Sequence, residues 1–99
     1  MYDMKNLGKL KKLEENASNA FETFFAFDKA AMAPGAVPVK YKELVAVAVA
    51  LTTQCPYCIE IHAGRARQAG ASDAEFAEIT AVTAAIRAGG AITHATHLY

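Results

Sequence analysis

The chain has 99 residues, of which 54% are hydrophobic, and ten Lys and Arg residues balance ten Asp and Glu residues. This length supports one modest hydrophobic core, so we expect a single domain spanning residues 1–99, and the absence of net charge argues against a nucleic-acid partner. Because the longest apolar run is far shorter than the ~20 residues of a membrane span, and no apolar signal sequence precedes it, we expect a cytoplasmic protein without a membrane partner.

The apolar periodicity of the chain predicts an all-α protein of about five helices. Leucine, alanine and phenylalanine recur at spacings of three and four in the first thirty residues, which predicts one long helix over residues 4–30. The stretch APGAVP then ends this helix, because Pro34 and Pro38 cannot continue it.

A second helix is predicted over residues 39–53, where KYKELVAVAVALTT is apolar on nearly every side. A helix of this kind is expected to be buried all round. Pro56 suits the first position of a third helix, which places Cys55 at its N-cap and ends it near Ala69, before Gly70.

A fourth helix is predicted from the capping-box spacing of Ser72 and Glu75 to about Ala88, where Gly89 and Gly90 should stop it. A short fifth helical segment, residues 91–99, would follow. The many alanines and the apolar second helix exceed what one 99-residue core can hide, so we expect a homo-oligomer.

Both cysteines lie in the stretch QCPYCIEIH, residues 54–62. Two cysteines three residues apart at the start of a helix can approach disulfide distance, and the free N–H groups of the first turn stabilise a thiolate. His62 lies one turn after Cys58 on the same face and could accept its proton, which favours Cys58 as the nucleophile and Cys55 as the resolving thiol. The N-cap position of Cys55 favours the opposite order, and the spacing alone leaves both open.

Glu43 is the acid within the otherwise apolar second helix. It is either a buried proton carrier that orients His62, or a solvated acid in the first turn of that helix. Glu60 is expected on the surface, and Tyr57 is either a lid over the thiols or a packing residue.

Glu43, Cys55-Pro56-Tyr57-Cys58 and His62 together resemble the E-x11-C-x-x-C-x3-H signature of the alkylhydroperoxidase D-like proteins, within the carboxymuconolactone decarboxylase family. The likeness covers roughly residues 20 to 97. It implies a helical domain assembled as trimers or hexamers, with a thiol-dependent peroxidase or disulfide reductase activity.

The resemblance also implies a role for each residue of the motif. Glu43 would be the proton-relay acid, Cys55 the resolving cysteine, Cys58 the peroxide-attacking cysteine and His62 the base. Tyr57 stands where the peroxidases of the family have a relay histidine. True lactone decarboxylases of the family lack the CxxC pair, so the two cysteines argue against a lyase.

The expected substrate is a hydroperoxide. No Gly-rich cofactor loop is present, so we expect no bound cofactor, and electrons would come from an external dithiol, which the resemblance suggests is a lipoyl protein or a thioredoxin-like donor. Three alternatives remain: a carboxymuconolactone decarboxylase-type lyase, a non-catalytic helical interaction protein, and a zinc-binding protein with a site made by Cys55, Cys58, His94 and His97.

Overall fold

The computed structural model describes residues 2–99, and every regular element within them is helical. The chain forms two compact units, the first ending at Val39 and the second running from Lys40 to Tyr99. The all-α prediction is therefore confirmed for the described residues.

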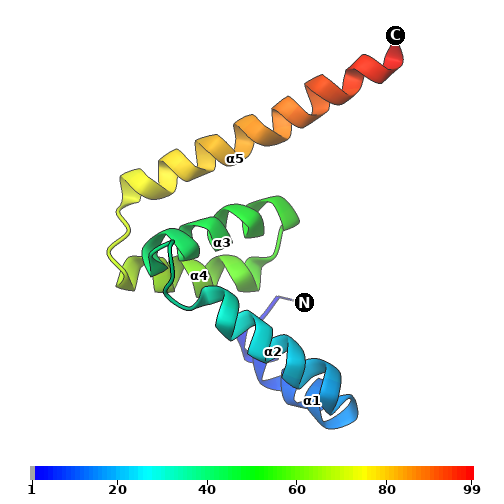
Figure 1. Cartoon of the computed structure of the whole chain (residues 1–99), viewed down its shortest axis with the longest axis vertical. Helices are drawn as coiled ribbons and strands as arrows, with labels where there is room; N and C mark the ends of the chain where they lie inside the picture. The colour runs from blue at the N-terminus through cyan, green and yellow to red at the C-terminus, as the bar shows by residue number, and fades with distance from the viewer. Residues whose placement is uncertain (1) are drawn as a thin grey trace. The chain divides into compact units, whose positions relative to one another are not determined.

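The first unit holds three short helical elements rather than the single helix predicted over residues 4–30. They are the 3₁₀ helix η1 (Met4–Lys9) and the α-helices α1 (Leu10–Asn16) and α2 (Ser18–Met32). The prediction was wrong because Ala17, with φ of −150° and ψ of 61°, leaves the helical region and reverses the chain. As a result α1 and α2 lie side by side (Figure 1), with Phe21 and Phe25 half-buried.

Helices α3 (Val39–Thr53) and α4 (Pro56–Gln68) have the predicted bounds. They run next to each other in Figure 1, joined by a short turn. Their buried hydrophobic side chains are Leu44, Val47 and Ala50 from α3 and Ala66 from α4. These residues form the core of the second unit.

The prediction that the second helix is buried all round is wrong for the single chain. Tyr41, Val45 and Val49 follow one another at four-residue spacing along α3, and they are 47%, 59% and 55% exposed. The core uses only one side of α3, because residues 43, 44, 47 and 50 are buried while this second apolar stripe is exposed.

Helix α5 spans Asp73–His94, and the 3₁₀ helix η2 (Ala95–Leu98) follows it. The predicted stop at Gly89 and Gly90 is therefore wrong. A glycine ends a helix when it adopts a positive φ, as Gly70 does after α4 with φ of 97°, but Gly89 and Gly90 keep helical backbone angles.

Two charged pairs hold the start of α5. The predicted capping box is confirmed, because the side chains of Ser72 and Glu75 each accept the other residue's backbone N–H. In addition, Nζ of Lys40 on α3 lies 3.0 Å from Oε2 of Glu75. The Ser72 N–H and, secondarily, the Lys40 ammonium lower the pKa of Glu75. At the end of α4, Arg67 pairs with Asp73 at 2.8 Å and stacks over the ring of Phe76.

Candidate functional site

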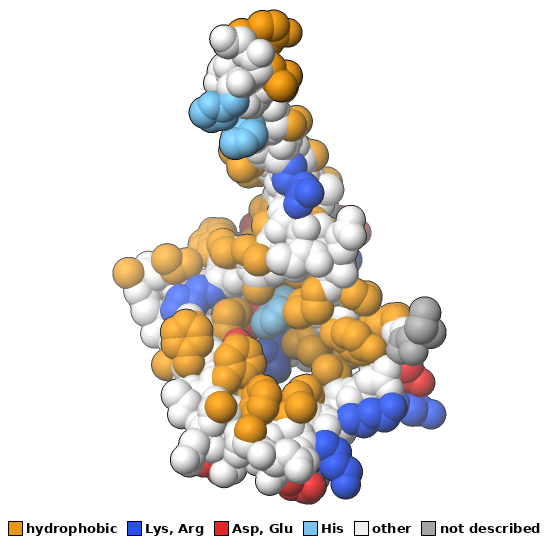
Figure 2. All heavy atoms as spheres, turned by 90° about the vertical axis from the view of Figure 1, so that its right-hand side faces the viewer, with side chains coloured by type: hydrophobic (Ala, Val, Ile, Leu, Met, Phe, Trp, Pro, Cys, Tyr) orange, Lys and Arg blue, Asp and Glu red, His pale blue; other side chains and the backbone are white. Residues whose placement is uncertain are grey.

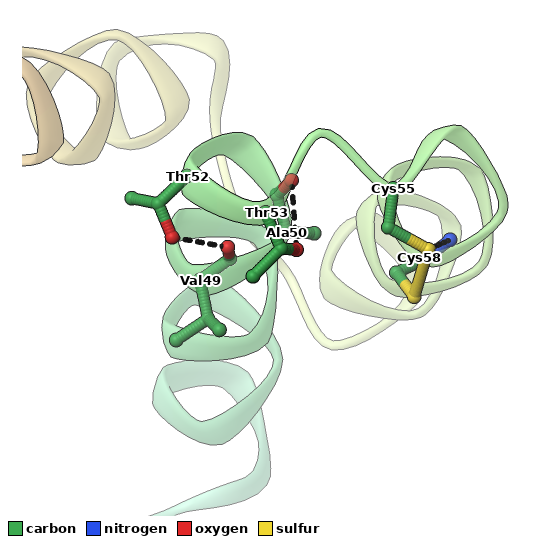
Figure 3. The surroundings of a disulfide bond; sticks show 6 residues. All are labelled: Val49, Ala50, Thr52, Thr53, Cys55 and Cys58. Carbon is green, nitrogen blue, oxygen red and sulfur yellow. Dashed lines mark hydrogen bonds between the residues drawn. A yellow bond between two sulfur atoms is a disulfide. The ribbon is translucent and has the colours of Figure 1, made fainter.

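The junction between α3 and α4 positions both cysteines. The Cys55 N–H bonds to the Ala50 carbonyl at 3.2 Å, and the Thr52 and Thr53 hydroxyls bond back to carbonyls in the last turn of α3 (Figure 3). The chain leaves α3 through Gln54, which has φ of 55°. A non-glycine residue in this left-handed region is unusual, and nothing in the sequence pattern indicated it.

Cys55 and Cys58 form a disulfide bond across the first turn of α4, with 5.4 Å between their Cα atoms (Figure 3). Cys55 occupies the predicted N-cap position, and its Sγ accepts the Cys58 N–H at 3.3 Å. Both residues are half-buried. The first turn of the helix therefore holds the two sulfur atoms together as a disulfide, with a backbone donor directed at Cys55.

Glu43 and His62 meet between α3 and α4. Oε2 of Glu43 lies 2.6 Å from Nδ1 of His62, and the two side chains are only 5% and 17% exposed. Glu43 is the buried charged residue of the core. Of its two predicted environments, the structure therefore shows the buried one, in which the carboxylate is paired with the imidazole rather than solvated.

This pairing sets the hydrogen bonds of the imidazole. With Glu43 ionised, Nδ1–H of His62 donates to the carboxylate, and Nε2 keeps a lone pair that can accept a proton. Since His62 follows Cys58 by one turn of α4, the structure places an imidazole, its carboxylate partner and a disulfide in one region of the second unit.

The remaining sequence candidates lie as follows. Tyr57 is half-buried between the two cysteines, and Glu60 is exposed as expected. The rings of His94 and His97 face each other edge-on at 4.9 Å at the junction of α5 and η2, where both residues are exposed.

The zinc alternative is not supported. Across residues 2–99, no three His, Cys, Asp or Glu side chains gather in a group that could hold a metal ion. The two cysteines that the zinc site required are bonded to each other instead. The same residues include no helix long and apolar enough to cross a membrane.

Comparison with known proteins points to one family. The model of the carboxymuconolactone decarboxylase family matches residues 18–99. Uncharacterized protein 4 in the cox locus of Paracoccus denitrificans is 46% identical over 74 residues, which cover 75% of this chain and 67% of that protein. An uncharacterized protein of Cupriavidus necator is 33% identical over 86 residues, covering 87% of this chain and 72% of that protein.

Solved structures share the fold. A crystal structure of a protein from Methanobacterium thermoautotrophicum has a TM-score of 0.80 and 33% identity, covering 88% of this chain and 98% of that one. A carboxymuconolactone decarboxylase family protein from Legionella pneumophila has a TM-score of 0.76 and 27% identity, covering 93% of this chain and 82% of that one.

Proposed function

Because the chain belongs to the carboxymuconolactone decarboxylase family, as an alkylhydroperoxidase D-like protein, we propose that it is a thiol-dependent oxidoreductase that reduces alkyl hydroperoxides. The observation that carries the proposal is the Cys55–Cys58 disulfide at the start of α4, next to a buried Glu43–His62 pair. Decarboxylation by a family lyase does not require two cysteines at this spacing, whereas dithiol chemistry does.

In the first step His62 takes the proton of Cys58 through Nε2, and Glu43 stabilises the imidazolium. The thiolate attacks the distal, proton-bearing oxygen of the hydroperoxide, and the O–O bond breaks. Cys58 becomes a sulfenic acid, and the other oxygen leaves as the alcohol after taking the proton from His62. One S–O bond forms, one O–O bond breaks, and sulfur supplies the two electrons.

In the second step Cys55 attacks the sulfenic sulfur, and water leaves as the disulfide forms. The Cα separation of 5.4 Å is that of an ordinary disulfide, so the two sulfurs can bond without a large movement of the backbone. The product that we propose for this step has the Cys55–Cys58 bond seen in the structure.

An external dithiol then returns two electrons and two protons by thiol–disulfide exchange, and it is itself oxidised to a disulfide. A lipoyl protein or a thioredoxin-like protein has the required chemistry. The same exchange makes disulfide reduction a second activity of this site. We further propose that the active protein is a homo-oligomer, a trimer or hexamer by analogy with the family.

Intact-mass spectrometry tests the proposal directly. The reduced protein is treated with one equivalent of an alkyl hydroperoxide, and the mass should fall by two hydrogens per chain while one equivalent of the alcohol appears. A Cys55→Ser/Cys58→Ser protein is the control and should leave the peroxide intact. A reduced wild-type protein that keeps its mass and leaves the peroxide unconsumed would exclude the peroxidase activity.

A further inference from the structure

Cys55 lies where two helix ends of opposite partial charge meet. Its N–H bonds to the Ala50 carbonyl at 3.2 Å, which is the bond that closes a Schellman motif at a helix end, and its Sγ accepts the Cys58 N–H in the first turn of α4. The start of α4 stabilises a thiolate at Cys55, whereas the end of α3 carries partial negative charge and opposes one. The ionisation of this thiol therefore depends on what neutralises the end of α3.

Arg87 on α5 supplies a positive charge at that end. Its Nη1 donates to the Thr52 carbonyl at 2.9 Å, a bond between residues 35 positions apart in the chain. Carbonyls in the last turn of a helix lack partners within the helix, and a cationic donor suits them. Thr52 precedes Cys55 by three residues, so their Cα atoms are at most about 11 Å apart.

No carboxylate competes for this guanidinium. Arg87 is the only Asp, Glu, Lys or Arg between Ile79 and Tyr99, and Figure 2 shows mainly hydrophobic and uncharged side chains around the histidine pair at this end of α5. The hollow of about 230 Å³ that Arg87 borders is otherwise lined by uncharged residues. Among residues 2–99, no Asp or Glu lies within salt-bridge distance of Arg87. Its charge therefore acts on the end of α3 instead of being cancelled in an ion pair.

From these contacts we infer that Arg87 tunes the Cys55–Cys58 pair, because its charge at the end of α3 favours the thiolate of Cys55. A thiolate exists only in the reduced protein, so this charge stabilises the dithiol relative to the disulfide. Arg87 is a positioning residue, since it acts through the Thr52 carbonyl rather than on a sulfur atom. The inference rests on the dithiol chemistry proposed above, and its consequence is a disulfide that the external dithiol reduces more readily.

The other ionisable groups around the dithiol do not change when Arg87 is substituted. They are Glu43 on α3, and Tyr57, Glu60 and His62 on α4. The pair formed by Glu43 and His62 lies one turn beyond Cys58, so it acts mainly on Cys58. A change in the titration of Cys55 on substitution of Arg87 is therefore assigned to Arg87.

Arg87→Gln and Arg87→Lys in the full chain test the inference. Glutamine keeps an N–H donor and removes the charge, whereas lysine keeps the charge. A Cys58→Ser parent leaves Cys55 as the only thiol, so its alkylation by iodoacetamide can be followed against pH. Arg65→Gln is the matched control, because Arg65 is exposed and lies about 15 Å from Cys55 along α4.

The midpoint of the alkylation profile should move to higher pH in Arg87→Gln. The rate at neutral pH should fall about two- to fivefold, which is the effect of one charge at a helix end. The rate on the high-pH plateau should stay near that of the parent, because the thiolate is fully formed there. Arg87→Lys and Arg65→Gln should keep the midpoint of the parent, and added salt should reduce the difference between Arg87→Gln and the parent.

The proteins with both cysteines give a second measurement, in which loss of charge and loosening of the turn have opposite signs. Equilibration with reduced and oxidised glutathione, above both thiol midpoints, should shift about two- to fivefold toward the disulfide in Arg87→Gln, because the reduced form has lost a stabilising charge. If Arg87 only held the turn in place, its loss would separate the sulfur atoms and shift the equilibrium toward the dithiol. Circular dichroism verifies the fold, and Arg87→Met replaces Arg87→Gln if the latter does not fold.

Three results overturn the inference: an Arg87→Gln midpoint equal to that of the parent, a shift of the same size in Arg87→Lys, or a glutathione equilibrium that moves toward the dithiol. Neither measurement uses a hydroperoxide, so the outcome is separate from that of the proposed function. A wild-type protein that consumes no peroxide, while Arg87→Gln shows both shifts, would contradict the peroxidase and support the role of Arg87. Peroxide consumption without either shift would do the reverse.

Discussion

The two sulfur atoms of the disulfide have different surroundings. Cys55 Sγ accepts the Cys58 N–H at the helix start, and Cys58 precedes His62 by one turn. The backbone donor and the positive end of the helix stabilise charge on Cys55, while the imidazole can remove a proton from Cys58. A stable thiolate is a good leaving group in thiol–disulfide exchange, which suits Cys55. A thiol with a base beside it is a good nucleophile, which suits Cys58.

This difference predicts opposite behaviour for the two single cysteine variants. Cys58→Ser should lose peroxide consumption, because the remaining thiol has no imidazole one turn away. Cys55→Ser should react once with peroxide and accumulate a sulfenic acid on Cys58, trapped by dimedone and located by mass spectrometry. Dimedone labelling of Cys55 in the Cys58→Ser protein would reverse the assigned order.

Glu43→Gln should slow the reaction without unfolding the protein. Glutamine keeps a hydrogen bond to Nδ1 of His62 but removes the negative charge that stabilises the imidazolium. Peroxide consumption and the alkylation rate of the cysteines at neutral pH should fall by roughly 100-fold, the low end of what a positioned base contributes.

Glu78→Gln makes the same charge change on the exposed surface of α5 and should leave both rates unchanged. If Glu43→Gln instead lost its helical circular dichroism, Glu43 would be a structural residue only.

At the scale of elements, the junction of α3 and α4 depends on one left-handed residue. Gln54 has φ of 55°, a conformation that glycine adopts at no steric cost. Gln54→Gly should therefore stabilise the protein by about 0.5–1 kcal/mol, measured by urea unfolding. Thr53→Gly, one position earlier in the helix, should instead destabilise it by about 1 kcal/mol. Equal destabilisation by both variants would show that the Gln54 side chain contributes more than its backbone conformation costs.

The start of α5 should make stability depend on acid pH through Glu75. Its pKa in the folded chain is lowered first by the Ser72 N–H and then by Lys40, so the carboxylate stabilises the fold above its unfolded pKa and loses that effect as pH falls through the folded value. Urea unfolding between about pH 7 and pH 3 should show a smaller loss of stability for Glu75→Gln than for wild type.

The effects of Ser72 and Lys40 on the pKa of Glu75 can be separated. Lys40→Met should remove only the smaller part of this pH dependence, because the Ser72 backbone bond remains. Glu78→Gln is the control with the same charge change. A Glu75→Gln profile that runs parallel to wild type over the whole range would contradict the assigned role.

Local sequence patterns predicted where helices start better than where they end or which of their faces are buried. Pro56 and the Ser72–Glu75 box marked the starts of α4 and α5 because capping groups act within one turn. The break at Ala17 and the passage of α5 through Gly89 and Gly90 carry no such local signal. The proximity of Glu43 to His62 follows from the family motif, whereas the hydrogen bond between them required the antiparallel placement of α3 and α4.

At the scale of the whole molecule, the core is small for the apolar content of the chain. Its buried hydrophobic residues in the described part are Leu44, Val47, Ala50 and Ala66, and none of the large side chains is fully buried. A chain of this size buries a smaller fraction of its surface on folding than a larger domain does. A small core therefore limits the free energy of unfolding of a single chain. In the homo-oligomer that we propose, contacts between copies would be part of the folding free energy rather than an addition to a stable monomer.

This coupling predicts that the midpoint of thermal unfolding depends on protein concentration. For a two-chain assembly, a hundredfold dilution lowers the free energy of unfolding by about 1.4 kcal/mol per chain. The midpoint of thermal unfolding should therefore fall by roughly 6–10 °C. Calorimetry or circular dichroism between about 1 and 100 μM measures the shift. The Ile92→Glu protein, in which a charge replaces an apolar side chain of α5 that is 71% exposed, should unfold at a temperature that depends less on concentration. A wild-type midpoint that is independent of concentration would mean that the single chain is stable by itself.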